Sequence, residues 1–342
     1  MTTTTLWYLS VHGGSDSGNN LLSFDTTGRL VSARVLDDNA VALRELRGFH
    51  VLPDGRLLVA NAHKGEGKIL QFAAAASPTA PRTYQGAFCV FDPGHNPGLL
   101  HPFNLRVGPD GNLYVSNQGS SNDPSSTNGV TRYGGPGTSD AGEPLAIPPY
   151  WREHAEEHLF PGTAIPANKR AQHGVKRIRD LLFARDGFLY VADEKRNEVR
   201  RYDGATFEYL ERIVSKDDGL KTPVHLLLSD DKKHLYIGSE KNDSVLRYHF
   251  KTGAVETFVE SGAAGLHAPA GLAMDGTWLY VCSRKSREVL RYRLSDGLPD
   301  SEPFITSEEL FKGSSDDPEF ILQVKVPGRS AYASGTHNVK EP

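Results

Sequence analysis

Short apolar stretches alternate with turn residues along most of the chain, and they do so in a repeating order. The clearest copy is LLFARDGFLYVADEKRNEVRRY at 181–202. There, two apolar stretches, Leu181–Ala184 and Phe188–Ala192, flank Asp186-Gly187, and a third stretch, Glu198–Tyr202, follows a polar loop. An Asp-Gly dipeptide in this setting predicts a β-hairpin, and we expect both turn residues to have positive φ. The unit is therefore three consecutive antiparallel strands.

The second of these strands recurs along the chain. Its copies are Leu57–Ala62, Leu113–Gln118, Leu189–Glu194, Leu235–Glu240 and Leu279–Arg284, with weaker copies at Leu6–Val11 and Ala331–Thr336. A fourth strand is predicted in three of the units, at Leu30–Leu36, Leu210–Val214 and Val255–Val259. Most copies are about 44 to 56 residues apart, which is a typical period for the blades of a propeller.

Four short antiparallel strands at this period predict an all-β protein, a six-bladed β-propeller with four-stranded blades. The chain begins with what reads as a second strand, and Pro318–Val326 reads as a first strand. We therefore expect the N- and C-terminal strands to close one blade together. If Ala331–Thr336 forms a separate second strand, the alternative is seven blades. A repeat that runs from end to end predicts a single domain spanning residues 1–342.

Three of the repeats resemble known propeller families. YVADEKRNEVRRY, with Asp193 closing the second strand and Asn197 before the third, resembles the NHL repeat. TPVHLLLSDDKKHLYIGSEKNDSVLRY and APAGLAMDGTWLYVCSRKSREVLRY are similar to NHL and to SMP-30/gluconolactonase-like units. The resemblance implies a propeller, and the SMP-30-like lactonases hold a divalent cation with Glu, Asn and Asp side chains from the starts of inner strands.

Composition narrows the function classes. The net charge of −4 with mixed signs gives no reason to expect a nucleic-acid or membrane partner. Cys89 and Cys282 lie far apart, without the spacing of a zinc finger or a disulfide framework. The first residues lack the pattern of a secretion signal, and no apolar stretch reaches membrane-spanning length. We expect a soluble cytoplasmic protein, monomeric by default.

An insertion at 119–175 interrupts the repeat. It contains a Ser/Asn/Asp loop, a Gly/Pro segment, a short amphipathic stretch at Tyr150–Phe160 and the start of a basic stretch, Lys169–Arg179. Loops between second and third strands, and links between blades, emerge at the face where the inner strands begin. We call this end of the central channel the mouth. Long loops in compact domains often carry function, so we expect the insertion beside or over the mouth.

Aligning the inner strands at their starts brings chemically interesting residues to one level. That level, the axial ring, consists of Gly48, Asn104, Asp180, His225, Gly271 and Phe320. Glu319 is expected across the channel from the three polar members. Carboxylate and amide oxygens with an imidazole suit Ca²⁺, Mg²⁺ or Zn²⁺, so Asn104, Asp180, His225 and Glu319 are predicted metal ligands. Asp180 and His225 are the predicted catalytic proton carriers.

Alternatives exist for the same residues. The ring side chains can instead hydrogen-bond to each other and to backbone groups, because polar groups buried near the axis need partners. NHL-type amidating lyases, which hold zinc with several histidines, suggest a rival set consisting of His225, His101 and His267. His50 follows the ring position and is expected to pack between blades.

Two function classes follow. The first is a metal-assisted hydrolase or lyase that acts on a small molecule, such as a lactone or an ester, at the mouth. The second is a non-catalytic scaffold that binds a protein or a nucleic acid through charged loops. That surface would consist of Lys195, Arg196, Lys241, Arg284 and Lys285.

Overall fold

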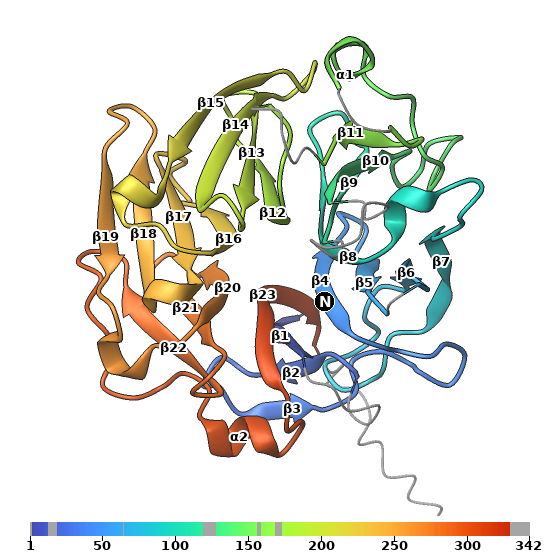
Figure 1. The fold of residues 1–342 in the computed structure, drawn as a ribbon. Helices are drawn as coiled ribbons and strands as arrows, with labels where there is room; N and C mark the ends of the chain where they lie inside the picture. The colour runs from blue at the N-terminus through green and yellow to red at the C-terminus, as the bar shows by residue number, and fades with distance from the viewer. Residues whose placement is uncertain are drawn as a thin grey trace, which may run out of the picture.

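Six β-sheets stand around a central axis (Figure 1). The structure is a computed structural model that describes residues 2–12, 19–63, 65–118, 128–155, 159–167 and 173–328. Each sheet presents one strand to the axis, and these inner strands are β23, β4, β8, β12, β16 and β20. The prediction of an all-β, six-bladed propeller is confirmed.

The strands of each blade are given from the axis outward. The first blade consists of β23 (Asp317–Pro327), β1 (Thr3–His12), β2 (Leu22–Phe24) and β3 (Leu30–Ser32). The second consists of β4 (Leu46–Val51), β5 (Leu57–Asn61), β6 (Lys68–Phe72) and β7 (Tyr84–Val90). The third consists of β8 (Pro102–Val107), β9 (Leu113–Asn117), β10 (Gly129–Tyr133) and β11 (Thr163–Ile165). The fourth consists of β12 (Ile178–Phe183), β13 (Phe188–Asp193), β14 (Glu198–Asp203) and β15 (Tyr209–Val214). The fifth consists of β16 (Pro223–Leu228), β17 (His234–Ser239), β18 (Ser244–His249) and β19 (Val255–Val259). The sixth consists of β20 (Pro269–Met274), β21 (Trp278–Ser283) and β22 (Glu288–Arg293).

The helices are short. They are α1 (Pro149–His154), α2 (Ser307–Phe311) and the 3-10 turns η1 (Pro97–Leu99), η2 (Lys216–Asp218), η3 (Glu240–Asn242) and η4 (Ala263–Gly265). Within the described ranges, no helix is both long enough and apolar enough to span a membrane.

The two ends of the described chain close the first blade, as expected. β1 pairs antiparallel with β23 from Thr3 opposite Pro327 to His12 opposite Asp317. The N–H of Gly328 then donates to the carbonyl of Thr2 at 2.8 Å. The six described sheets account for every predicted repeat except Ala331–Thr336, which lies outside the described residues.

The Asp-Gly hairpins differ from the expected turn in one respect. Gly187 has a φ of 83°, but Asp186 is not among the residues with positive φ. Instead, the Asp186 carboxylate accepts hydrogen bonds from the N–H of Phe188 at 3.1 Å and from the hydroxyl of Tyr190 at 2.6 Å. The aspartate therefore holds the turn with its side chain, and only the glycine needs the left-handed conformation. The same Tyr-to-Asp bond recurs between Tyr114 and Asp110.

The hydrophobic core lies between neighbouring blades, because both faces of each sheet are apolar. Trp7 of the first blade packs against Tyr280 of the sixth, with ring centroids 4.2 Å apart. Inside the insertion, α1 lies at the rim of the ring (Figure 1), where Trp151 is fully buried in a cluster with Val175 and Tyr202. Residues 119–127, 156–158 and 168–172 of the insertion fall outside the described residues, and its place over the mouth stays a prediction.

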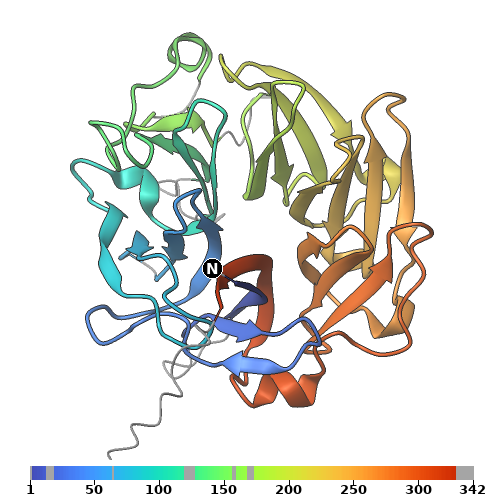
Figure 2. The ribbon, with the colours of Figure 1, turned by 180° about the vertical axis from the view of Figure 1, so that it is seen from behind.

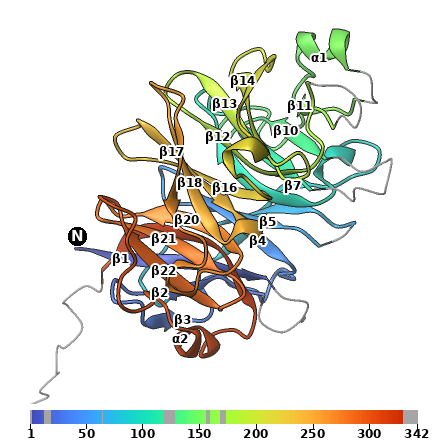
Figure 3. The same cartoon turned by 60° about the vertical axis from the view of Figure 1, so that its left-hand side comes forward.

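The two ends of the axis differ in which loops they carry. Inner strands run from the mouth to the far face, where the hairpins to the second strands lie. The paired ends of β1 and β23, at Thr3 and Pro327, also lie at the far face. Figure 2 views the ring from the side opposite to Figure 1, and Figure 3 shows the N-terminus emerging at one face of the disk.

Candidate functional site

The structure brings Asn104, Asp180 and His225 together at the axis, on β8, β12 and β16. The Nδ2 of Asn104 donates to Oδ1 of Asp180, and Nε2 of His225 lies 3.3 Å from Oδ2 of Asp180. The three side chains are almost completely buried. The alignment of inner strands therefore placed these three residues at one level, as expected.

Backbone N–H groups already occupy the acceptor atoms of the ring. Oδ2 of Asp180 accepts from the N–H of Leu226 at 2.8 Å, and Oδ1 accepts from that of Leu181 at 2.8 Å. Nδ1 of His225 accepts from the N–H of Leu272 at 2.7 Å. Each contact to Leu226 or Leu272 crosses to the next blade. The polar ring thus joins consecutive blades. This is the alternative role expected for these residues, in which their side chains hydrogen-bond to each other and to backbone groups.

Glu319 lies apart from this group. Its carboxylate is 3.5 Å from Arg47 and 3.4 Å from Arg284, and among the described residues it forms no ion pair with a member of the ring. Arg106 lies 3.2 Å from His225 and 3.9 Å from Asp180 on the other side. Its positive charge, together with the occupied acceptor atoms, makes the ring a poor site for a divalent cation. No group of three or more His, Cys, Asp or Glu residues within the described ranges is arranged to hold a metal.

Crowding explains the glycines of the ring. A Cβ at Gly48 would lie 2.2 Å from Oδ1 of Asn104, and one at Gly271 would lie 2.7 Å from the carbonyl oxygen of Glu319. Phe320 fills the level beside them, with its ring edge-on to Phe103 and to His225 at centroid distances of 5.4 and 5.5 Å. Aromatic and polar side chains therefore pack together across the axis at this level.

A second group of charged residues lies nearer the mouth than the axial ring, and three of its members, Arg47, Arg179 and Glu319, directly precede a ring residue. We call it the mouth cluster, and its members are Arg47, Arg177, Arg179, Arg284, Glu194, Glu240 and Glu319. They come from the starts of inner strands or from loops that open at the mouth. Arg179 and Arg177 contact Glu194 at 2.6 and 3.0 Å, and Arg284 contacts Glu240 at 3.2 Å. Phe103 lies between two guanidinium groups, at 5.4 Å from Arg47 and 4.8 Å from Arg179.

Glu319 is the least satisfied member of the mouth cluster. Its side chain is 1% exposed, yet neither carboxylate oxygen accepts a hydrogen bond from the described residues. Burial alone would raise its pKa, but the charges of Arg47 and Arg284 outweigh burial and hold the pKa below its ordinary value. Glu319 is therefore an ionised, buried carboxylate with free lone pairs.

Two neutral histidines border the cluster. Burial first, and then the charge of Arg47, lowers the pKa of His12 to about 4 and that of His101 to about 4. Nε2 of His12 lies 3.2 Å from Arg47, which can donate to it only if the imidazole proton sits on Nδ1. His101 thus lies with His12 and Arg47, whereas His225 belongs to the axial ring. The expected His225, His101 and His267 zinc set is not among groups arranged to hold a metal in the described part of the chain.

Sequence reasoning predicted Glu319 as a metal ligand but did not group it with the arginines of the mouth cluster. Arg47, Arg179 and Glu319 occupy the position just before the axial ring, so the same alignment contained them. The available signal was that charged residues recur there in three inner strands, although a strand start near the axis is otherwise apolar, as at Phe103 and Val224. Their opposite charges also predict pairing across the axis.

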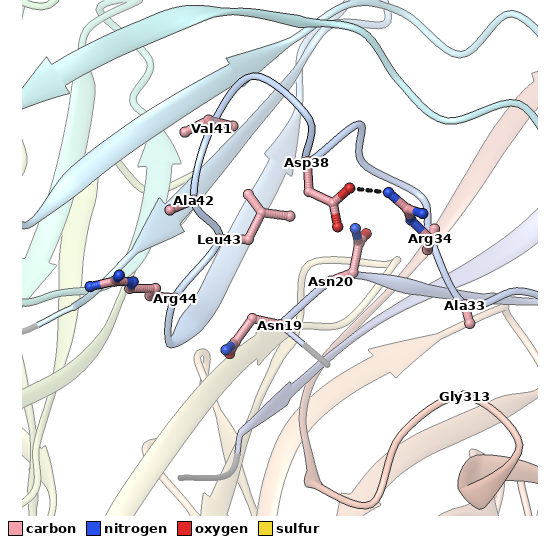
Figure 4. A pocket seen from close by; sticks show the side chains of 10 residues that line it. All are labelled: Asn19, Asn20, Ala33, Arg34, Asp38, Val41, Ala42, Leu43, Arg44 and Gly313. Carbon is pink, nitrogen blue, oxygen red and sulfur yellow. Dashed lines mark hydrogen bonds and ion pairs between the residues drawn. The ribbon is translucent and has the colours of Figure 1, made fainter. Parts of the chain in front are cut away.

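A separate cavity of about 700 Å³ lies beside the first blade (Figure 4). Its walls come from the links that precede β2 and β4. Asn20 is held by Leu36 through two hydrogen bonds of 2.9 Å, and Asp38 is paired with Arg34. The only carboxylate in the described lining is therefore neutralised by the arginine next to it, and this cavity is a weaker candidate for catalysis.

Sequence comparison links part of the chain to lactonases. Residues 177–298 match the family model described as Lactonase, 7-bladed beta-propeller. The match spans roughly a third of the chain, and the described strands form six sheets rather than seven. Five members of the mouth cluster lie in the matched stretch, namely Arg177, Arg179, Glu194, Glu240 and Arg284. No curated protein matches the sequence.

Solved structures share the fold at low sequence identity. A chain of the nidogen/laminin complex has a TM-score of 0.61 at 10% identity, covering 94% of this chain and 98% of that chain. A candidate 6-phosphogluconolactonase from Bacteroides fragilis NCTC 9343 has a TM-score of 0.57 at 13% identity, with coverages of 94% and 98%. One from Bacteroides uniformis ATCC 8492 has a TM-score of 0.58 at 14% identity, with coverages of 94% and 99%. At these identities the similarity shows the propeller fold alone.

Proposed function

We propose that the protein hydrolyses a small lactone or ester that carries an anionic substituent, using the mouth cluster. The observation that carries the proposal is Glu319, a buried carboxylate that accepts no hydrogen bond from the described residues and lies between the guanidinium groups of Arg47 and Arg284. The partial match to a lactonase family supports the same reaction class. The SMP-30-like resemblance supports a lactone as substrate, but the bonding of the axial ring does not favour the cation of that group.

The reaction requires a group that accepts a proton from the attacking water. It also requires a group that stabilises the negative charge that develops on the carbonyl oxygen. Glu319 can hold a water molecule and accept its proton as the water oxygen attacks the carbonyl carbon. A neighbouring guanidinium can donate hydrogen bonds to the oxygen on which negative charge develops. When the tetrahedral intermediate collapses, the bond to the ring oxygen breaks, and the proton on Glu319 passes to that oxygen. The product is a hydroxy acid.

The arginines also bear on the substituent of the substrate. A guanidinium group has five N–H donors, and the Arg47 and Arg284 side chains each make only one hydrogen-bond contact to the described residues, to His12 and Glu240 respectively. The remaining donors suit bidentate contact with a phosphate or carboxylate group. Burial is the main cause of the low pKa of His101, and the charge of Arg47 adds to it; an anion bound to Arg47 would offset this second contribution and raise the pKa of His101.

The test is acid release from glucono-1,5-lactone and from its 6-phosphate, measured above the spontaneous rate. We expect the protein to accelerate hydrolysis, and Glu319→Gln to lower kcat/KM by about 100-fold. Arg284→Gln should raise KM for the phosphorylated lactone more than for the neutral one. The exposed Glu143→Gln is the matched control and should behave like wild type. Failure of the folded protein to accelerate either reaction, or full activity in Glu319→Gln, would refute the proposal.

The second function class, a non-catalytic scaffold that binds a protein or a nucleic acid through charged loops, stays a separate proposal. Three of its five predicted surface charges already have partners at the mouth, since Arg196 contacts Asp193 at 3.4 Å, and Arg284 contacts Glu240 and Lys285 contacts Asp317, both at 3.2 Å. A partner that binds there would compete with these ion pairs. Lactone hydrolysis without dependence on any loop-face charge would count against the scaffold as the main function.

A further inference from the structure

The far end of the channel contains a cavity that the mouth cluster does not use. Its volume is about 510 Å³, within the range of small-molecule sites. Its walls are mostly apolar and include Leu182, Leu227, Leu228, Met274, Ile321 and Leu322. His50, Arg106 and His225 also line it, on the same inner strands as the axial ring. His50 thus borders a cavity, where the sequence predicted packing between blades.

Two cationic residues, Arg106 and Lys232, line this cavity, and Arg106 has few partners among the described residues. Its nearest carboxylate is Asp180 at 3.9 Å, beyond hydrogen-bond distance. The Asp180 oxygens already accept from Leu181, Leu226 and Asn104. Among the described residues, the one side-chain contact of Arg106 within that distance is to Nε2 of His225 at 3.2 Å. Most guanidinium donors of Arg106 are therefore available to a ligand.

The remaining polar groups of the cavity do not cancel this charge. Burial first, and then the charge of Arg106, lowers the pKa of His50 to about 4, and burial lowers that of His225 to about 4. Both imidazoles are therefore neutral at pH 7. Asp230 and Lys232, which also line the cavity, carry opposite charges.

We propose that the far end of the channel binds a small amphipathic monocarboxylate, with its carboxylate on Arg106 and its apolar body along the leucine and methionine walls. A guanidinium fork suits a planar carboxylate, and the half-buried Leu227, Met274 and Leu322 would lose their remaining water-exposed surface. This site lies across Phe320 from the mouth cluster and is independent of the proposed lactone hydrolysis.

Octanoate is the probe, and octan-1-ol and octylammonium are its neutral and cationic counterparts. Titration calorimetry of the full-length protein should show one octanoate site, with octylammonium at least about tenfold weaker. Arg106→Gln should weaken octanoate by about tenfold or more and leave octan-1-ol unchanged, and Arg106→Lys should retain part of the affinity. Arg247→Gln removes a far-face arginine that is paired with Glu256, and should bind octanoate like wild type.

Equal affinity for octanoate and octylammonium would overturn the proposal, as would unchanged octanoate binding in a folded Arg106→Gln protein. Ala273→Leu places a larger side chain in the same cavity and should weaken octanoate and octan-1-ol together. Arg106→Gln should keep the lactone hydrolysis rate of wild type. Absence of hydrolysis with intact octanoate binding would therefore reject the proposed function without touching this site.

Discussion

The imidazole of His225 accepts a hydrogen bond from the backbone N–H of Leu272, at 2.7 Å and across the boundary between two blades. Because Nδ1 is the acceptor, the neutral ring carries its proton on Nε2, which faces Asp180 at 3.3 Å. Protonation of Nδ1 would break the bond to Leu272. The contact between the two blades therefore depends on a neutral histidine.

Acid should destabilise the protein through this residue. Burial lowers the pKa of His225 from 6.5 to about 4, so the unfolded chain binds the proton more readily. Stability is then lost as the pH falls from about 6.5 towards 4, by about 3 kcal/mol for this group. Urea unfolding at pH 7, 5.5 and 4 measures the loss. His225→Asn, which keeps an acceptor but cannot titrate, should lose less stability than wild type over that window, and an identical loss would contradict the assignment.

Both removal of the Asp180 carboxylate and its conversion to an amide should destabilise the protein. Its oxygens accept from Asn104, Leu181 and Leu226, so Asp180→Ala leaves buried donors unpaired and should cost about 3 kcal/mol. Asp180→Asn should cost nearly as much, because its NH₂ group would face donors. Urea unfolding checks both values, with the exposed Glu308→Gln as the control. A stable Asp180→Asn protein would show that the acceptors are dispensable.

Chelation is expected to leave the folded protein unchanged. Backbone N–H groups occupy the acceptor atoms of Asp180 and His225, and Arg106 lies beside them, so a resident divalent cation would contribute little there. Thermal unfolding before and after dialysis against EDTA should give the same Tm, and elemental analysis should find no stoichiometric metal. A lower Tm in EDTA that is restored by Ca²⁺, Mg²⁺ or Zn²⁺ would instead support the predicted metal site.

Gly48→Ala should disrupt the ring through a steric clash. The new Cβ would lie 2.2 Å from Oδ1 of Asn104 and 2.9 Å from its Cα. We expect a loss of about 2 to 4 kcal/mol in the free energy of unfolding. In the double variant Gly48→Ala/Asn104→Gly the clash with the side chain is absent, so the two costs should not add. Strict additivity would mean that the two residues do not contact each other.

Glu319→Gln should lower stability as well as activity. Arg47 is almost fully buried, and removal of the carboxylate leaves its charge with weaker compensation, at a cost of about 3 kcal/mol. The pair Arg47→Gln/Glu319→Gln should be less destabilised than the sum of the single variants, because neither charge then remains alone. Chemical unfolding of all four proteins measures the coupling, and a coupling near zero would remove the pair from the mouth cluster.

Local patterns went far in predicting the fold. The spacing of LYVADE and its copies, and the Asp-Gly hairpins between apolar strands, indicated blades, their number and their closure by Pro318–Val326. These features depend on residues close in sequence, or on one repeat being like the next. The turn at Asp186 differed only because its side chain, rather than a positive φ, satisfies the backbone.

The chemistry of the axis was decided by tertiary structure. The sequence by itself placed Asn104, Asp180 and His225 at one level, because inner strands of a propeller start at the same height. Which way each carboxylate turns depends on the partners that neighbouring blades supply. Leu226 and Leu272 occupy the acceptors of Asp180 and His225, whereas Glu319 turns to Arg47 and Arg284. A difference of one residue along a strand thus separates a structural ring from a candidate site, since adjacent side chains on a strand point to opposite sides.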